Sequence, residues 1–268
     1  MLDPDVEKFI DPLTPAALKA LRLAVSGSET GLGHHSDRSL ARFLRAKKTV
    51  ERAAENVQRY DAFRKQRGIE GTLPFEKVAA THDFGFQLFD PANCYSKDGA
   101  VIVHGKPANL QGKAVPEDLQ LLVFYIIDWI TISVEKAQTH GVFMIIDWTD
   151  MAFSLYNRRY PHMIAPMMSN VLPVRLKAIA HVNGARFFSI MYSVIKPLLS
   201  QKLRARLKVL ARAADLLEFV DKEHLPTLLG GDVPLSVEHN RSLPTSRSSA
   251  KGTPMQPCDC LRVNRRTL

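Results

Sequence analysis

Short runs rich in β-branched residues alternate with longer helical stretches through much of this chain. The strand-like runs are residues 101–103, 142–146, 176–182 and 207–210. Apolar stretches at helical spacing lie between them, at residues 116–138, around 155–170 and at 187–199, and another follows at 216–221. Because parallel strands need a long crossover, usually a helix, this alternation predicts an α/β fold with a mostly parallel β-sheet and crossover helices.

A helical region precedes the strand pattern. Three helices are expected there, with N-caps at Thr14, at Ser36 or Asp37, and at Thr49. Gly68 ends the third helix. We therefore predict an N-terminal helical subdomain over residues 1–70 and a second domain over residues 71–232. Residues 233–268 are rich in Ser, Arg, Pro and Thr, so we expect a disordered basic tail there.

Composition places the chain among globular proteins of a reducing compartment. Its 268 residues are 46% hydrophobic and 24% charged, with a net charge of +9. The three cysteines, Cys94, Cys258 and Cys260, form no disulfide framework. The N-terminus lacks the apolar core of a signal peptide, and no stretch approaches the roughly 18 apolar residues of a membrane span. We expect a cytoplasmic protein with transient membrane or endosomal association.

Acidic residues are absent from residues 151–214, although this window contains eleven Lys and Arg. A basic surface beside apolar stretches suits an anionic partner such as a membrane surface, an anionic lipid or nucleic acid. A solvated basic face on an ordinary core is the alternative. Lys202 and Arg206 would share a helical face, and with Arg175 and Lys177 they can form a cluster for a multiply charged phosphate. No exposed aromatic residues are interleaved with these cations, so nucleic acid is not expected as a partner.

Signs of catalysis are few. The sequence contains no nucleophile elbow, no phosphate-binding loop and no His-Glu-x-x-His zinc motif. A Gly-Leu-Gly at residues 31–33 precedes a helix but follows no strand, which disfavours a dinucleotide-binding loop. We interpret the other candidates as a solvated pair (His34 and His35), turn caps rather than cation ligands (Asp147 and Asp150) and a structural thiol (Cys94). We expect no enzymatic activity, no catalytic residue, no metal and no cofactor.

The helical stretch that begins at Pro116 is apolar on nearly every face, which is typical of a helix buried on more than one side. It is either a tightly packed core helix or part of the wall of a lipid pocket. The predicted pocket residues come from this stretch, the next strand and the stretch at 187–199: Phe124, Ile127, Phe143, Ile145, Phe187, Ile190 and Met191. Residues 187–199 would then be a lid, with Gly184 and Pro197 as flexible points. A permanently docked, kinked amphipathic helix is the alternative.

Six segments, in order over residues 36–231, resemble the CRAL-TRIO lipid-binding family. They are Arg42-Phe43-Leu44-Arg45-Ala46-Lys47, the strand regions at 97–103 and 142–147, the proline-led strand at 172–183, the region at 195–203, and Leu225-Pro226-Thr227-Leu228-Leu229-Gly230-Gly231. The chain is most similar to the branch of alpha-tocopherol transfer protein, cellular retinaldehyde-binding protein and clavesin. Two departures are visible: Asn183-Gly184-Ala185 replaces a pattern with proline, and the stretch between Pro161 and Pro173 is shorter than in the tocopherol branch.

The resemblance implies a sheet floor and a helical lid around an apolar cavity that holds one hydrophobic lipid. It also implies a basic cleft for phosphoinositides such as phosphatidylinositol bisphosphate, and the matching positions are Lys47, Arg175, Lys177, Lys202 and Arg206. We therefore expect a monomeric lipid-binding and transfer protein whose partners are phosphoinositide membranes and a small hydrophobic ligand. A lipid-responsive regulatory or adaptor module that transfers nothing is the alternative.

Overall fold

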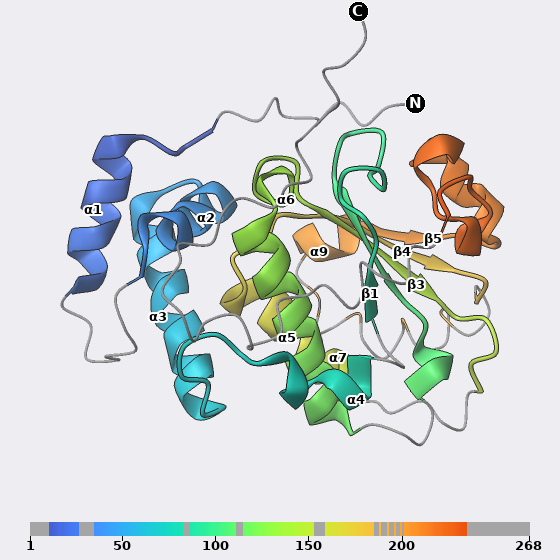
Figure 1. Ribbon diagram of the computed structural model, residues 1–268, viewed down its shortest axis with the longest axis horizontal. Coiled ribbons are helices and arrows are strands. Elements are labelled where there is room, and N and C mark those ends of the chain that lie inside the picture. Colours follow the sequence, from blue (N-terminus) through green and yellow to red (C-terminus); the bar gives the residue numbers. More distant parts are fainter. Residues whose placement is uncertain are drawn as a thin grey trace, which may run out of the picture.

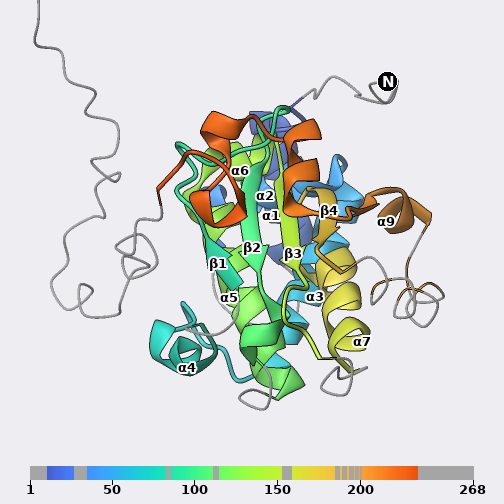
Figure 2. The ribbon, with the colours of Figure 1, turned by 90° about the vertical axis from the view of Figure 1, so that its right-hand side faces the viewer.

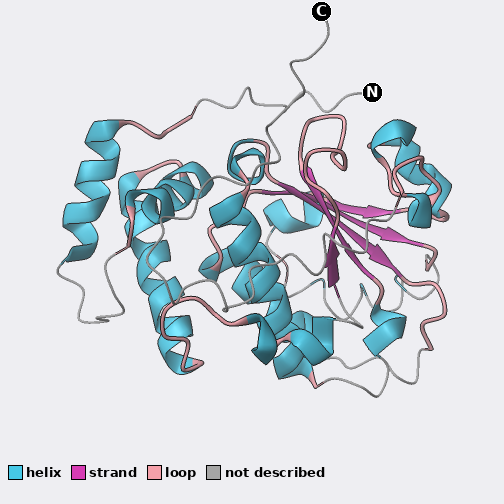
Figure 3. Cartoon of the chain, viewed as in Figure 1, coloured by secondary structure: helices cyan, strands magenta, loops and turns pink. Residues whose placement is uncertain are grey.

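The computed structural model describes residues 11–26, 35–82, 86–110, 115–152, 159–184 and 201–234, together with residues 188, 192, 196 and 199. Almost all of the predicted tail and most of the predicted lid therefore lie outside the described residues. The chain forms a mixed α/β structure with a group of helices at one end and a sheet at the other (Figure 1, Figure 3).

One sheet carries five strands in the order β1-β2-β3-β4-β5. Their bounds are Phe86–Leu88 for β1, Val101–Gly105 for β2, Val142–Asp147 for β3, Leu176–Val182 for β4 and Leu207–Val209 for β5. Strands β2 to β5 pair in parallel, and β1 pairs with β2 in the antiparallel direction. The mostly parallel sheet and its four predicted strands are confirmed, whereas the edge strand β1 was not predicted.

Three helices precede the sheet: α1 Pro15–Ser26, α2 Asp37–Lys47 and α3 Val50–Gln66. Each begins at a side-chain oxygen that accepts from a backbone N–H three residues later. These caps are Thr14, Ser36 and Thr49, with donor–acceptor distances of 3.1, 3.2 and 3.4 Å. Such a bond satisfies an N–H that has no partner within the helix. The three predicted helix starts are confirmed, with Ser36 rather than Asp37 as the cap of α2.

The remaining helices are short except for α5. They are η1 Phe75–Lys77, α4 Ala79–His82, η2 Pro107–Leu110, α5 Pro116–Ser133, α6 Glu135–Thr139, α7 Arg159–Pro166, the π-helical turn η4 Met167–Val171, α9 Gln201–Ala205, η6 Ala213–Glu218, η7 Lys222–His224 and η8 Thr227–Leu229. The prediction of one helix over 116–138 was wrong, because Val134 leaves the helical region with φ −113° and ψ 104°. The Gln138 side chain links α6 to the end of α5 by donating to the Thr131 carbonyl at 2.7 Å.

Two separate apolar cores lie on the two faces of the sheet. The first packs α5, the N-terminal helices and α7 against side chains such as Met144 and Ile146 of β3. The second packs the C-terminal 3-10 segments against Phe143 and Ile145 of the same strand. Figure 2 shows these segments in front of the strands, on the side away from α5. Because successive side chains of a strand point to opposite faces, β3 contributes to both cores.

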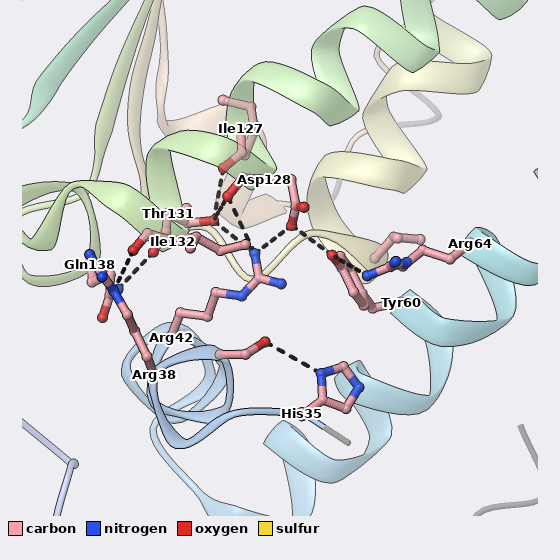
Figure 4. Close-up of polar contacts among 12 residues, drawn as sticks. His35, Arg38, Arg42, Tyr60, Arg64, Ile127, Asp128, Thr131, Ile132 and Gln138 are labelled. Atoms are coloured by element: carbon pink, nitrogen blue, oxygen red, sulfur yellow. Dashed lines mark hydrogen bonds and ion pairs between the residues drawn. The ribbon is translucent and has the colours of Figure 1, made fainter. Parts of the chain in front are cut away.

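A buried arginine joins the N-terminal helices to α5. Arg42 of α2 is 2% exposed, and its guanidinium forms an ion pair with Asp128 and donates to the Thr131 hydroxyl at 3.2 Å. The Tyr60 hydroxyl of α3 donates to the same Asp128 carboxylate at 2.8 Å, so three helices meet at one acid (Figure 4). The guanidinium carbon of Arg42 also lies 4.9 Å from the centre of the Tyr60 ring, within range of a cation–π contact.

Candidate functional site

Three of the predicted phosphate-binding cations lie at one end of β4 and β5. Arg175 directly precedes β4, and Lys177 is its second residue. Lys177 has no partner residue in the register of β3 with β4, because Val142 pairs with Leu176 and the next residue, Phe143, pairs with Ala178. Arg206 directly precedes β5, and its carbonyl accepts from the Ile179 N–H at 2.9 Å. Because β4 and β5 are parallel neighbours, Arg206 and Lys177 both lie at the N-terminal end of these two strands.

Lys177 already has an acidic partner. Its ammonium lies 3.0 Å from a carboxylate oxygen of Asp98, in the turn that leads into β2. Burial by itself raises the pKa of Asp98, but hydrogen bonds from the Ser96 hydroxyl and Lys177 hold this pKa below its usual value. An anionic ligand at Lys177 must therefore compete with a carboxylate that is held in place and ionised.

Arg206 differs from Lys177 because it has no such partner. Its side chain is partly buried, and burial lowers the pKa of its guanidinium from the ordinary value. No hydrogen-bond acceptor and no carboxylate contacts it in the part of the chain that the structure describes. A desolvated cation without a counter-ion attracts an anion more strongly than a solvated or paired one.

The other predicted cations are placed less favourably. Lys47, at the end of α2, donates to the Ser169 carbonyl at 3.1 Å, and Arg175 donates to the Thr139 carbonyl. The side chain of Lys202 lies outside the described residues. Helix α9 ends at Ala205 and Arg206 lies in the turn after it, so α9 carries only Lys202 of the two residues predicted to share a helical face.

The predicted pocket residues do not line one common surface. Phe124 of α5 stacks on Tyr60 and Phe63 of α3, with ring centres 5.6 and 5.0 Å apart, and Ile127 belongs to the same core. Phe143 and Ile145 belong to the core on the opposite face of the sheet. The grouping of these four residues was therefore wrong, because the two-residue period of β3 points its odd-numbered side chains away from α5. Phe187, Ile190 and Met191 lie outside the described residues.

A group of aromatic rings occupies the α5-facing side of the sheet, where the predicted lid begins. Phe188 contacts His181 of β4 with ring centres 4.0 Å apart, and Tyr192 stacks on Phe188 at 5.6 Å. Trp148, directly after β3, lies nearly parallel to the His181 ring, with ring centres 5.8 Å apart. Sequence reasoning missed Trp148 and His181, although the alternation along β4 already put His181 on the face of Ile179.

Three structural interpretations of the sequence can be checked directly. One Asp147 oxygen accepts from the Thr149 N–H and hydroxyl and from Asn183, so Asp147 holds the turn as predicted. Cys94 is buried, and burial raises the pKa of its thiol to about 12, which fits a structural role. The prediction of a solvated pair was wrong for His35, whose Nε2 lies 3.0 Å from Asp61 with a side chain 11% exposed. His34 lies outside the described residues.

None of the described ranges contains a helix that is both long and apolar enough to cross a bilayer.

Comparisons with known proteins agree with this architecture. The model of the CRAL/TRIO domain family matches residues 92–231, more than half of the chain. The crystal structure of Sfh5 aligns with a TM-score of 0.54 and 13% identity, over 81% of this chain and 83% of the Sfh5 chain. A likeness at that identity shows the fold alone.

Two curated relatives are similar over part of their length. Tyrosine-protein phosphatase non-receptor type 9 of Homo sapiens is 26% identical over 198 residues, which are 73% of this chain and 33% of the phosphatase. Clavesin-2 of Mus musculus is 28% identical over 103 residues, which are 37% of this chain and 32% of clavesin-2. This chain therefore matches about a third of the length of each relative.

Proposed function

We propose that this chain, which belongs to the CRAL/TRIO domain family, binds one hydrophobic lipid, transfers it and docks on phosphoinositide-containing membranes. The family supports lipid binding in general. The phosphoinositide partner, the single cargo and the transfer step are our proposal, and so are the site residues Lys47, Arg175, Lys177, Lys202 and Arg206.

The observation that carries the membrane part of the proposal is Arg206. It is a partly buried guanidinium that has no counter-ion among the described residues, and it lies at the same end of the strands as Lys177, within a sequence window free of acids. Arginine presents a planar set of donors that matches phosphate oxygens in a bidentate manner. A phosphoinositide headgroup supplies several phosphates to such a cluster, so it is a better ligand than a singly charged lipid.

The cargo part rests on the α5-facing side of the sheet. Trp148, His181, Phe188 and Tyr192 form an aromatic group there, next to the segment proposed as the lid. A lipid chain that leaves water gains about 0.8 kcal/mol per CH₂ buried, whereas its move from a bilayer to an apolar site changes little. A carrier can therefore exchange lipid with a membrane once it is docked there.

Replacing Arg206 with alanine is expected to weaken binding to vesicles that contain phosphatidylinositol bisphosphate by roughly five- to tenfold, since one cation near an anionic surface contributes about 1 kcal/mol. Vesicle co-sedimentation against the lipid concentration measures this. Arg204→Ala is the matched control, because Arg204 is an exposed residue of the neighbouring helix α9. Added salt should weaken wild-type docking. Equal binding by the two variants would contradict the proposed role of Arg206.

Replacing Asp98 with asparagine is expected to strengthen the same vesicle binding by about two- to fivefold, because the substitution removes the carboxylate that competes for Lys177. Asp221→Asn is the control: Asp221 is an exposed acid 3.7 Å from Lys97, and it does not contact Lys177. Thermal unfolding of both variants shows whether the fold is retained. Weaker binding of a folded Asp98→Asn variant would exclude Asp98 as a competitor.

Transfer is separated from simple binding by a second measurement. Wild-type protein mixed with donor vesicles that carry a fluorescent lipid and with acceptor vesicles should speed up movement of that lipid in proportion to protein concentration. Docking without any such acceleration would favour the regulatory or adaptor module over the transfer protein.

A further inference from the structure

His181 presents one ring edge to the α5-facing side of the sheet. In β4 the side chains of Ala180 and Val182 belong to the core under the C-terminal 3-10 helices. Ile179 belongs with the other core, so His181, two residues later, faces the same side as Ile179. Its contacts with Trp148 and Phe188, both of that core, agree with this direction.

The hydrogen bond from Trp148 determines where the proton of the His181 ring lies. The indole Nε1–H donates to Nδ1 of His181 at 2.9 Å. Indole nitrogen is a donor only, so Nδ1 must be the acceptor and the ring proton must be on Nε2. The ring is 8% exposed, and burial lowers the pKa of His181 to about 3, so the ring is neutral at physiological pH. His181 therefore offers an uncharged Nε2–H donor.

This Nε2–H has no acceptor in the described part of the chain, where Trp148 is the hydrogen-bond partner of the ring and bonds through Nδ1. The face of the ring is covered by Phe188, which has no acceptor to offer. The ring keeps 8% exposure, so a ligand that covers this donor without offering an acceptor removes its water and gives nothing in return. An acceptor supplied from outside the chain would restore the missing hydrogen bond.

Gly184 explains how Trp148 reaches its position. A Cβ placed on Gly184 would lie 2.4 Å from the Cβ and 2.8 Å from the Cγ of Trp148, which is too close for any side chain. Residues 183–185, where this chain departs from the proline-containing pattern of the CRAL-TRIO family, are thus the place where the Trp148 indole approaches the backbone closely. Gly184 thus leaves room for Trp148, and Trp148 in turn fixes the tautomer of His181.

We infer that the Nε2–H of His181 recognises an uncharged oxygen acceptor on the hydrophobic ligand, such as a carbonyl, ester, ether or hydroxyl oxygen. This inference rests on the proposed lipid-carrier function and deepens it by naming the chemical class of the cargo. A pure hydrocarbon leaves the donor unsatisfied. A neutral donor also gives an anionic head no charge to balance, so a lipid with one uncharged polar group suits the site better than a fatty acid anion.

The test is a competition between two probes of similar length, methyl palmitate and octadecane. The purified chain is incubated with phosphatidylcholine vesicles that contain both in equal amounts and is then repurified, and its bound lipids are measured by gas chromatography. Wild-type protein should take up the ester in roughly three- to tenfold excess, in line with the net value of one hydrogen bond. His181→Phe should bring the ratio near one while still taking up lipid, and His181→Gln, which retains a donor, should keep part of the preference.

Controls separate this inference from the proposed function. His162→Phe, an exposed residue of α7, should behave like wild type. Long-range proton–nitrogen NMR spectra of wild-type protein should show Nε2 protonated and should change with the ester but not with the hydrocarbon, a readout that does not depend on the folding of any variant. Equal uptake of both probes by wild type, or a full preference in His181→Phe, would overturn the inference alone. Uptake of neither probe would overturn the cargo site itself.

Discussion

Replacing Arg42 with alanine is expected to lower the free energy of unfolding by about 3 to 5 kcal/mol, the range for breaking a buried ion pair by removal of one partner. Arg42 is 2% exposed, and its loss leaves the Asp128 carboxylate with the Tyr60 hydroxyl but without its cation. The pKa of Tyr60, which burial raises to about 12 with help from Asp128, keeps that hydroxyl protonated and cannot replace the missing charge. Urea unfolding followed by circular dichroism measures the loss.

Arg38→Ala is the matched control for Arg42. Arg38 lies on the same helix and donates to the Ile132 and Ser133 carbonyls, but it is exposed (Figure 4). Its replacement should cost about 1 kcal/mol or less. The double variant Arg42→Met with Asp128→Leu should be more stable than either single variant, because it leaves no unpaired charge. A loss for Arg42→Ala no larger than that for Arg38→Ala would contradict a central role for this ion pair.

Acidification is expected to destabilise the protein through the buried histidines His104 and His181, and His104→Phe should remove the share that comes from His104. His104 of β2 is 2% exposed, neither of its ring nitrogens has a hydrogen-bond partner among the described residues, and burial lowers its pKa to about 4. Of the charged groups near it, Asp147 raises this pKa and Lys106 lowers it, both less than burial does. In the unfolded chain the ring takes up a proton near pH 6.5.

The direction in which stability changes with pH follows from proton binding by the folded and unfolded states. Between about pH 6.5 and pH 4 the unfolded chain binds a proton at residue 104 that the folded chain does not, so stability falls as the pH falls through this window. The full difference is about 3 kcal/mol, which corresponds to a shift in Tm of roughly 6 to 12 °C for a chain of this size.

Thermal unfolding at pH 7 and pH 4.5 measures the contribution of His104. The phenylalanine variant keeps the aromatic contact with Phe89, whose ring centre lies 5.7 Å away, and should be at least as stable as wild type at pH 7. Its Tm should fall less on acidification than that of wild type. His162→Phe, at an exposed histidine, should follow wild type at both pH values. Parallel decreases in wild type and His104→Phe would show that His104 does not control acid stability.

The sequence predicted those parts of the fold that rest on local patterns. Strands β2 to β5 and the helix caps at Thr14, Ser36 and Thr49 depend on residues close in sequence, and all were found. Strand β1, with the sequence Phe-Gln-Leu, contains no β-branched residue, so it lacks the composition by which the other strands were predicted. The break at Val134 was missed because neither glycine nor proline marks it and residues 135–139 are helical again.

The candidate site was harder to predict because it depends on the faces of the strands. Phe143 and Ile145 are as apolar as Met144 and Ile146, and only the packing of α5 shows which pair faces the first core. The sequence identified Arg206 as a cation, but the lack of a counter-ion among the described residues is a property of the folded chain. The role of His181 depends on Trp148, which is 33 positions away in sequence.

The division of apolar packing between the two faces of the sheet has a consequence for the working cycle of a carrier. Phe188 and Tyr192 pack on one face, whereas the 3-10 helices η6 to η8 hold the other through Leu216, Leu225 and Leu229. Contacts on one face can open locally while those on the other face keep the strands in register. In the carrier that we propose, each round of loading and unloading would then begin from an intact sheet and need no refolding step.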